Sequence, residues 1–174
     1  MNRRGFAIPI RVLISLILVF VITSIFYLSW RKVEILKAEA DVKNQIDYVL
    51  SEIEIMVASG DARDVSNPSD LSGDKRKFDL NLPEKVDFVA FGFNPEKEGK
   101  ITGDGSCIFY KIKGGNEKVI WLENIYFRKG KNESGRWVIS NEGFMIKNGK
   151  YSLIFELVEE IGGKKYVLIY PSSI

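Results

Sequence analysis

One uncharged stretch near the N-terminus constrains the fold of this chain more than any other feature. Residues 12–30 form a run of 19 residues without a charge, and thirteen of them are Val, Leu, Ile or Phe. A helix of about 20 apolar residues spans the hydrocarbon core of a bilayer. We therefore predict one membrane-spanning helix, with a buried helix of a soluble domain as the alternative.

The end of this stretch differs from the end of a cleaved secretory signal. Such a signal has a shorter apolar part and small residues at its cleavage site. Here the stretch ends with Tyr27 and Trp30 directly before Arg31. Aromatic residues of this kind suit the membrane interface. We expect the helix to stay attached to the chain, and basic residues on both sides leave its orientation open.

An amphipathic helix is predicted directly after the apolar stretch. No proline interrupts residues 33–59, and Gly60 is a suitable helix stop. Apolar residues recur there at helical spacing, so one apolar seam runs along a charged helix. The seam either packs on the chain's own domain or meets neighbouring helices in an assembly. Its residues are Ile35, Val42, Ile46, Val49, Ile53 and Met56.

Residues 61–174 are predicted to form a β-rich domain. We expect a solvated connector at residues 61–77, because Ser, Asp, Gly and charged residues dominate there. After it, short apolar runs alternate with Gly and Asn turns, which predicts antiparallel hairpins in a sandwich or a strongly bent sheet. The predicted strands are 78–82, 86–93, 107–112, 119–122, 125–128, 136–140, 144–146, 151–158 and 165–170.

The composition excludes several classes of function. The chain has no histidine, which removes the most common general base and zinc ligand. Its 25 basic and 23 acidic residues are spread evenly, so nucleic acid is not an expected partner. The one cysteine, Cys107, lies in an apolar run and is expected to be buried rather than nucleophilic. We identify no catalytic, metal or cofactor motif and do not expect an enzyme.

Two polar features remain in the β domain. Glu156 and Glu160 lie on or beside a predicted strand, and we expect both to face solvent. Asn132, Glu133 and Ser134 satisfy the acceptor pattern for N-glycosylation in a polar loop at residues 129–135, so Asn132 is a candidate modification site.

The extreme N-terminus adds a family resemblance. Arg3-Arg4-Gly5-Phe6 comes directly before the apolar helix, and Phe6-Ala7-Ile8-Pro9-Ile10 follows. This resembles the class III signal of type IV pilins and of archaeal pilin-like proteins. The resemblance implies that a prepilin peptidase cuts between Gly5 and Phe6 on the cytoplasmic side. It also implies that Pro9 occupies the proline position near the new N-terminus, and that the apolar helix is retained for assembly.

The resulting prediction is an α+β chain with three segments. These are a prepilin-like leader and transmembrane helix at 1–30, an amphipathic helical stalk at 31–60, and an extracytoplasmic β-sheet domain at 61–174.

The first functional hypothesis is a pilin-like subunit of a type IV pilus-like filament or of its assembly or secretion machinery. The subunit would be anchored in the cell membrane before assembly, with a prepilin peptidase and other pilin-like subunits as partners. Arg11, a charge within the packing helix, favours a minor subunit over a major one. The alternative is a permanently anchored single-pass protein whose external β domain is a binding module or an accessory subunit; its ligand stays open.

Overall fold

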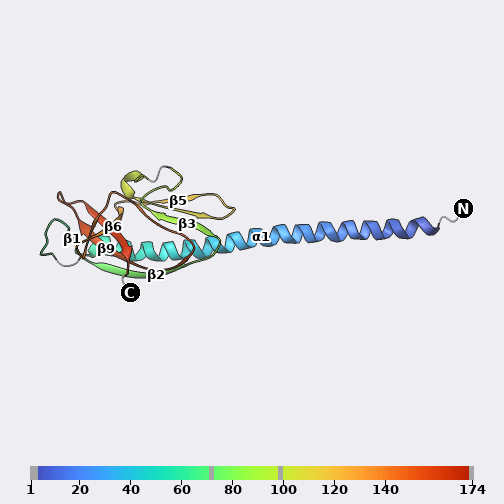
Figure 1. Cartoon of the computed structure of the whole chain (residues 1–174), viewed down its shortest axis with the longest axis horizontal. Coiled ribbons are helices and arrows are strands. Elements are labelled where there is room, and N and C mark those ends of the chain that lie inside the picture. The colour runs from blue at the N-terminus through green and yellow to red at the C-terminus, as the bar shows by residue number, and fades with distance from the viewer. Residues whose placement is uncertain (1–3, 71–72, 98–99, 173–174) are drawn as a thin grey trace. The chain divides into compact units, whose positions relative to one another are not determined.

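The computed structural model describes residues 4–70, 73–97 and 100–172, with side chains from residue 9 onward. It divides into two compact units, residues 1–37 and residues 38–174, which we describe separately. Helix α1 (Arg4–Ser59) supplies the first unit and also enters the second. All other elements belong to the second unit (Figure 1). The predicted α+β class is confirmed.

The first unit is the apolar part of α1. From residue 10 to residue 30 its large apolar side chains are all exposed, from 46% for Val21 to 74% for Phe26. Three hydroxyls in this part donate to carbonyl oxygens one turn earlier: Ser15 at 3.0 Å, Thr23 at 2.8 Å and Ser24 at 2.8 Å. The helix is long and apolar enough to cross a membrane, and these hydroxyls find acceptors within it.

The larger sheet of the second unit has six strands, in the order β1-β9-β10-β6-β7, with β2 also paired to β9. Antiparallel pairing joins β9 to β10 and to β2, whereas β10 pairs with β6 and β1 with β9 in parallel. The predicted antiparallel hairpins are confirmed for β9–β10 and β6–β7, and the two parallel pairs join strands that are distant in the sequence. The strands are β1 (Arg63–Asp64), β2 (Lys75–Leu82), β6 (Phe127–Glu133), β7 (Arg136–Ile139), β9 (Gly149–Glu159) and β10 (Lys165–Pro171).

The smaller sheet is wholly antiparallel, in the order β5-β4-β3-β8. A short 3₁₀ helix, Gly103–Gly105, lies just before β4. The strands are β3 (Val86–Phe91), β4 (Cys107–Ile112), β5 (Lys118–Trp121) and β8 (Phe144–Ile146).

A cluster of phenylalanines joins the two sheets. Phe155 of β9 meets Phe78 of β2 at 5.2 Å between ring centroids, and it meets Phe91 of β3 at 5.7 Å. Phe127 of β6 meets Phe91 at 5.4 Å. All these contacts are edge-to-face, the geometry that the charge distribution of aromatic rings favours. The core of the second unit therefore lies between the sheets.

The apolar seam of α1 completes this core. The seam residues from position 42 onward are at most 3% exposed, whereas Ile35 in the first unit is half-buried. The Gln45 side chain donates to the Asn81 carbonyl of β2 at 3.0 Å and accepts from its N–H at 2.8 Å. On the other side, Glu39 pairs with Lys118 of β5. The helix thus contacts both sheets, and the seam packs on the chain's own domain.

Three predicted boundaries differ most from the structure. The connector at 61–77 contains β1 and the first residues of β2, because two polar strands pair there with the edge of β9. β6 continues to Glu133 through the predicted loop at 129–135, since β7 pairs with it. Finally, the compact units divide after Lys37, so most of the predicted stalk folds with the sheets.

Candidate functional site

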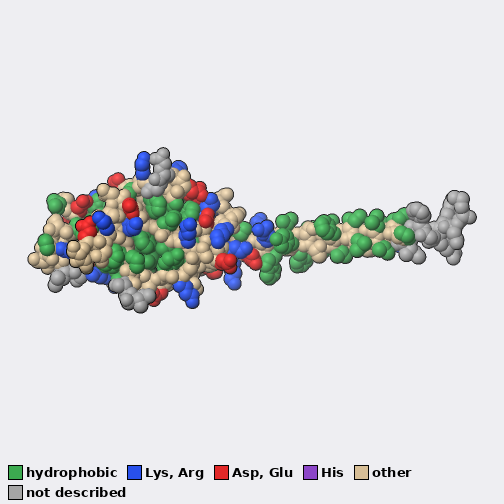
Figure 2. Space-filling view, in the orientation of Figure 1, with side chains coloured by type: hydrophobic (Ala, Val, Ile, Leu, Met, Phe, Trp, Pro, Cys, Tyr) green, Lys and Arg blue, Asp and Glu red, His purple; other side chains and the backbone are tan. Residues whose placement is uncertain are grey.

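The surface of α1 in the first unit is unusual for a helix of a folded protein. Figure 2 shows its described side chains as mostly hydrophobic. A soluble amphipathic helix buries one apolar stripe, whereas this helix is apolar all round from residue 12 to residue 30. Such a surface needs lipid or other apolar helices around it. We take it as the candidate functional site.

The residues of the pilin-type signal are only partly described. Gly5 and Phe6 lie within α1, but the Phe6 side chain lies outside the described part of the chain, as does all of Arg3. Pro9 is described and lies inside α1. A proline near the start of a helix removes an N–H that would otherwise bond within the first turns. The presumed cut between Gly5 and Phe6 stays a prediction.

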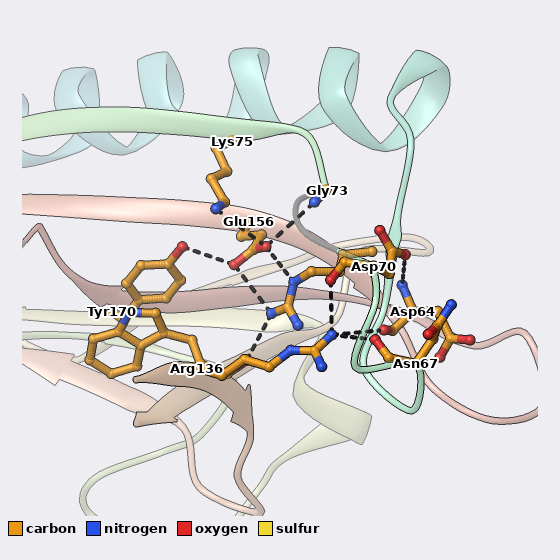
Figure 3. Close-up of polar contacts among 10 residues, drawn as sticks. Asp64, Asn67, Asp70, Gly73, Lys75, Arg136, Glu156 and Tyr170 are labelled. Atoms are coloured by element: carbon orange, nitrogen blue, oxygen red, sulfur yellow. Dashed lines mark hydrogen bonds and ion pairs between the residues drawn. The ribbon is translucent and has the colours of Figure 1, made fainter. Parts of the chain in front are cut away.

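The second notable site is a buried ion cluster around Glu156, where Lys75, Gly73 and Tyr170 converge (Figure 3). Glu156 is only 1% exposed and Arg63 only 3%. Arg63 Nε donates to Glu156 Oε1 at 2.6 Å, and the Tyr170 hydroxyl donates to Oε2 at 2.8 Å. Lys75 Nζ lies 3.7 Å from Oε1. The expectation that Glu156 faces solvent is wrong.

Glu156 is buried because other side chains cover the outer face of the larger sheet. Glu156 shares that face with Val158 and Ile154, while Tyr166 and Tyr170 of β10 pack beside them. Trp137 and Ile139 of β7 cover the cluster, which excludes water from a face that the alternation had assigned to solvent. Glu160 lies beyond the end of β9 and is exposed, as predicted.

The pKa of Glu156 reflects two opposing causes. Burial raises it, but the hydrogen bonds from Arg63 and Tyr170 and the charges of Arg63 and Lys75 outweigh burial, so the net pKa lies below its ordinary value. The pKa of Tyr170 is raised by burial and by its hydrogen bond to the carboxylate. Glu156 is therefore ionised and Tyr170 neutral near pH 7.

This cluster fastens the segment after α1 to the sheet. Arg63 Nη2 also donates to the Trp137 carbonyl of β7 at 2.7 Å. Arg136 Nη2 donates to the Asn67 carbonyl at 2.5 Å and to the Asp70 carbonyl at 3.0 Å. Two arginines thus hold residues 63–70 against β7 and β9. Because every oxygen of Glu156 faces an internal donor, the cluster stabilises the fold rather than offering a free acid for chemistry.

Cys107 and Asn132 have contrasting environments. Cys107 is fully buried, which confirms its prediction, and burial raises its thiol pKa to about 11. The thiolate needed for nucleophilic chemistry is therefore scarce at neutral pH. Asn132 lies near the end of β6 opposite Trp137, is exposed, and accepts a hydrogen bond from the Gly135 N–H at 3.0 Å. It stays a candidate acceptor, at the end of a strand rather than in a free loop.

Two shallow depressions, of about 320 and about 280 Å³, adjoin the exposed Lys129–Glu142 ion pair of 2.7 Å. Phe93, Phe144 and Met145 line the first of them. No group of three or more His, Cys, Asp or Glu side chains in the described ranges could hold a metal ion. Lys129 and Glu142 line both depressions, and solvent screens an exposed ion pair of this kind.

Comparison with known proteins identifies no relative of this chain. No known protein family, curated protein or solved structure matches this chain. Its function is therefore inferred from its own residues and structure.

Proposed function

We propose that the chain is a pilin-like subunit of a type IV pilus-like filament or of its assembly or secretion machinery. It is anchored in the cell membrane by the apolar part of α1 and carries its β domain outside the cell. A prepilin peptidase trims it between Gly5 and Phe6, and α1 then packs against other pilin-like subunits.

The observation that carries this proposal is the exposed apolar surface of the first unit. A filament helix must suit two environments in turn, lipid before assembly and neighbouring helices afterwards. Large apolar side chains cover this helix, and the Ser15, Thr23 and Ser24 hydroxyls are satisfied by its own carbonyls. When the helix moves from lipid into a packed bundle of helices, these three hydroxyls therefore keep their hydrogen-bond acceptors.

The second unit also supports the proposal that the first unit mediates assembly. Its core is closed by the buried seam of α1, and the charge of its buried Glu156 is paired with Arg63. The apolar surface that is left for assembly lies mainly on the first unit. The signal-like residues Arg3-Arg4-Gly5-Phe6 stand directly before that surface, where the resemblance places a processing site.

The test compares filament recovery for wild type and Gly5→Leu in cells that make the full chain. Filaments sheared from the cell surface should contain the wild-type chain, while Gly5→Leu should stay in the membrane as the uncut precursor. Asn2→Ala, a leader change outside the signal residues, serves as the control and should behave as wild type. A wild-type chain found only in membranes would favour the permanently anchored binding module instead.

A further inference from the structure

The part of α1 within the second unit has an exposed face opposite its buried seam. We call this the outer face; its large apolar side chains are Tyr48, which is 61% exposed, and Ile55, which is 54% exposed. These two residues lie seven positions apart, so they line one side of the helix. Smaller exposed residues continue the same side: Ala40, Asn44, Ser51 and Ala58.

The outer face is acidic. Asp47 and Glu54 each precede one of its large apolar residues, and both are exposed. Residues 44–59 contain no Lys or Arg, and within the described part of the chain neither Asp47 nor Glu54 forms an ion pair. The face thus combines two unpaired negative charges with two exposed apolar anchors.

The first unit ends in a segment of the opposite character. We call residues 31–37 the basic segment; Lys32 and Lys37 are exposed there, with Val33 61% and Leu36 56% exposed between them. Residues 32, 33, 36 and 37 share one side of a helix by their spacing. The one acid in the segment, Glu34, accepts a hydrogen bond from Trp30 Nε1 at 2.9 Å. The segment follows the apolar stretch and so lies where water is present.

We propose that the basic segment of one copy docks on the outer face of a second copy. Parallel helices offset by 15 residues bring Lys32 opposite Asp47 and Val33 opposite Tyr48. At the same offset Leu36 lies one helical turn before Ile55, and Lys37 lies two residues before Glu54, within the span of its long side chain. In this arrangement opposite charges flank apolar contacts. The charges favour a second copy of the chain as the partner and fix the offset between the two helices.

This contact uses two different surfaces of one chain, so it is heterologous. A heterologous contact leaves one free surface at each end and adds copies into an open chain unless the rotation closes a ring. The inference therefore rests on the proposed function and deepens it, because it identifies which water-side residues order the subunits along the filament.

Charge reversal in the full-length chain tests the docking. Asp47→Lys with Glu54→Lys, or Lys32→Glu with Lys37→Glu, should each lower the fraction of chain in sheared filaments several-fold, because like charges then meet. All four changes together should restore the fraction, since opposite signs face each other again. Lys147→Glu with Lys150→Glu, on exposed residues at the turn before β9 and its first positions, is the matched control and should have no effect.

Disulfide cross-linking gives a second readout. Co-expressed full-length Val33→Cys and Tyr48→Cys chains with different tags should form a mixed dimer, and buried Cys107 should not compete. Val33→Cys paired with Ile161→Cys, an exposed site at the β9–β10 turn, should not form one.

The outcomes separate the two proposals. Wild-type chains that form no filament would defeat the proposed function and this docking together. Wild-type filaments that tolerate both charge reversals, or cross-links that lead only to a different protein, would overturn the docking of a second copy alone.

Discussion

Replacement of Arg63 by Met tests the buried ion cluster most sharply. Arg63→Met keeps an unbranched side chain but removes the donors to Glu156 at 2.6 and 3.4 Å and to the Trp137 carbonyl at 2.7 Å. Glu156 would then be buried with Tyr170, the Gly73 N–H at 3.5 Å and the more distant Lys75 as its remaining partners.

The expected decrease in the free energy of unfolding follows from the loss of the Arg63 donors. Removing one partner of a buried ion pair costs about 3–5 kcal/mol, and the remaining partners place Arg63→Met near the lower end, about 3 kcal/mol at pH 7. Arg63→Met with Glu156→Met should cost much less than the sum of the two single changes, because no buried charge is left unpaired. Lys131→Met, which breaks an ion pair with both side chains more than half exposed, should leave the stability nearly unchanged, because solvent screens such a pair.

The destabilisation caused by Arg63→Met should also depend on pH. In the wild type the folded pKa of Glu156 lies below its ordinary value of 4.5, so its contribution is present above that pH and is lost as the pH falls through the folded pKa. Without Arg63, burial raises the folded pKa, so stability is lost as pH rises instead. The difference between wild type and Arg63→Met should therefore be larger at pH 7 than at pH 3.

Urea unfolding of a fragment spanning residues 31–174, followed by circular dichroism and fluorescence at both pH values, measures these differences. A cost below about 1 kcal/mol at pH 7, or one that does not change with pH, would refute the reasoning about an ionised, internally paired Glu156.

Three further predictions concern the same domain. The fragment spanning residues 31–174 should be soluble and mostly β by circular dichroism, and its retention on membranes at high salt would contradict the assignment of all membrane affinity to the preceding residues. Ile53→Asp should lower its stability by several kcal/mol because Ile53 is fully buried, while Ile55→Asp on the outer face should change it little; equal effects would show that the seam is misassigned. Cys107, with its pKa raised to about 11, should resist iodoacetamide at pH 8 until urea unfolds the domain, and rapid labelling of the native protein would contradict its burial.

Periodicity predicted the parts of the fold that depend on local sequence. The alternation of Phe78, Leu80 and Leu82 with polar residues predicted β2, and all three are buried. The heptad-like spacing of Val42, Val49 and Met56 likewise predicted the face of α1 that is buried. In both cases the pattern repeats with the period of the element, so neighbours in the sequence carry the information.

Contacts between distant segments could not be read in the same way. Arg63 meets Glu156 across 93 residues, from a two-residue strand inside a stretch that looked like a solvated connector. One signal was present: residues 154, 156 and 158 place a glutamate between two apolar residues on one strand face. A strand that is apolar on both faces is covered on both, which requires a buried acid between them to have a partner. The parallel pairs β6–β10 and β1–β9 depend on the same kind of distant contact.

The measurement that tests the central claim most directly is the intact mass and N-terminal sequence of the chain from its native membranes and surface filaments. Processing predicts that Phe6 is the first residue, and that Gly5→Leu leaves the chain uncut. A native chain that begins at Met1 or Asn2 in cells with an active prepilin peptidase would contradict the pilin-like account and leave a permanently anchored β domain.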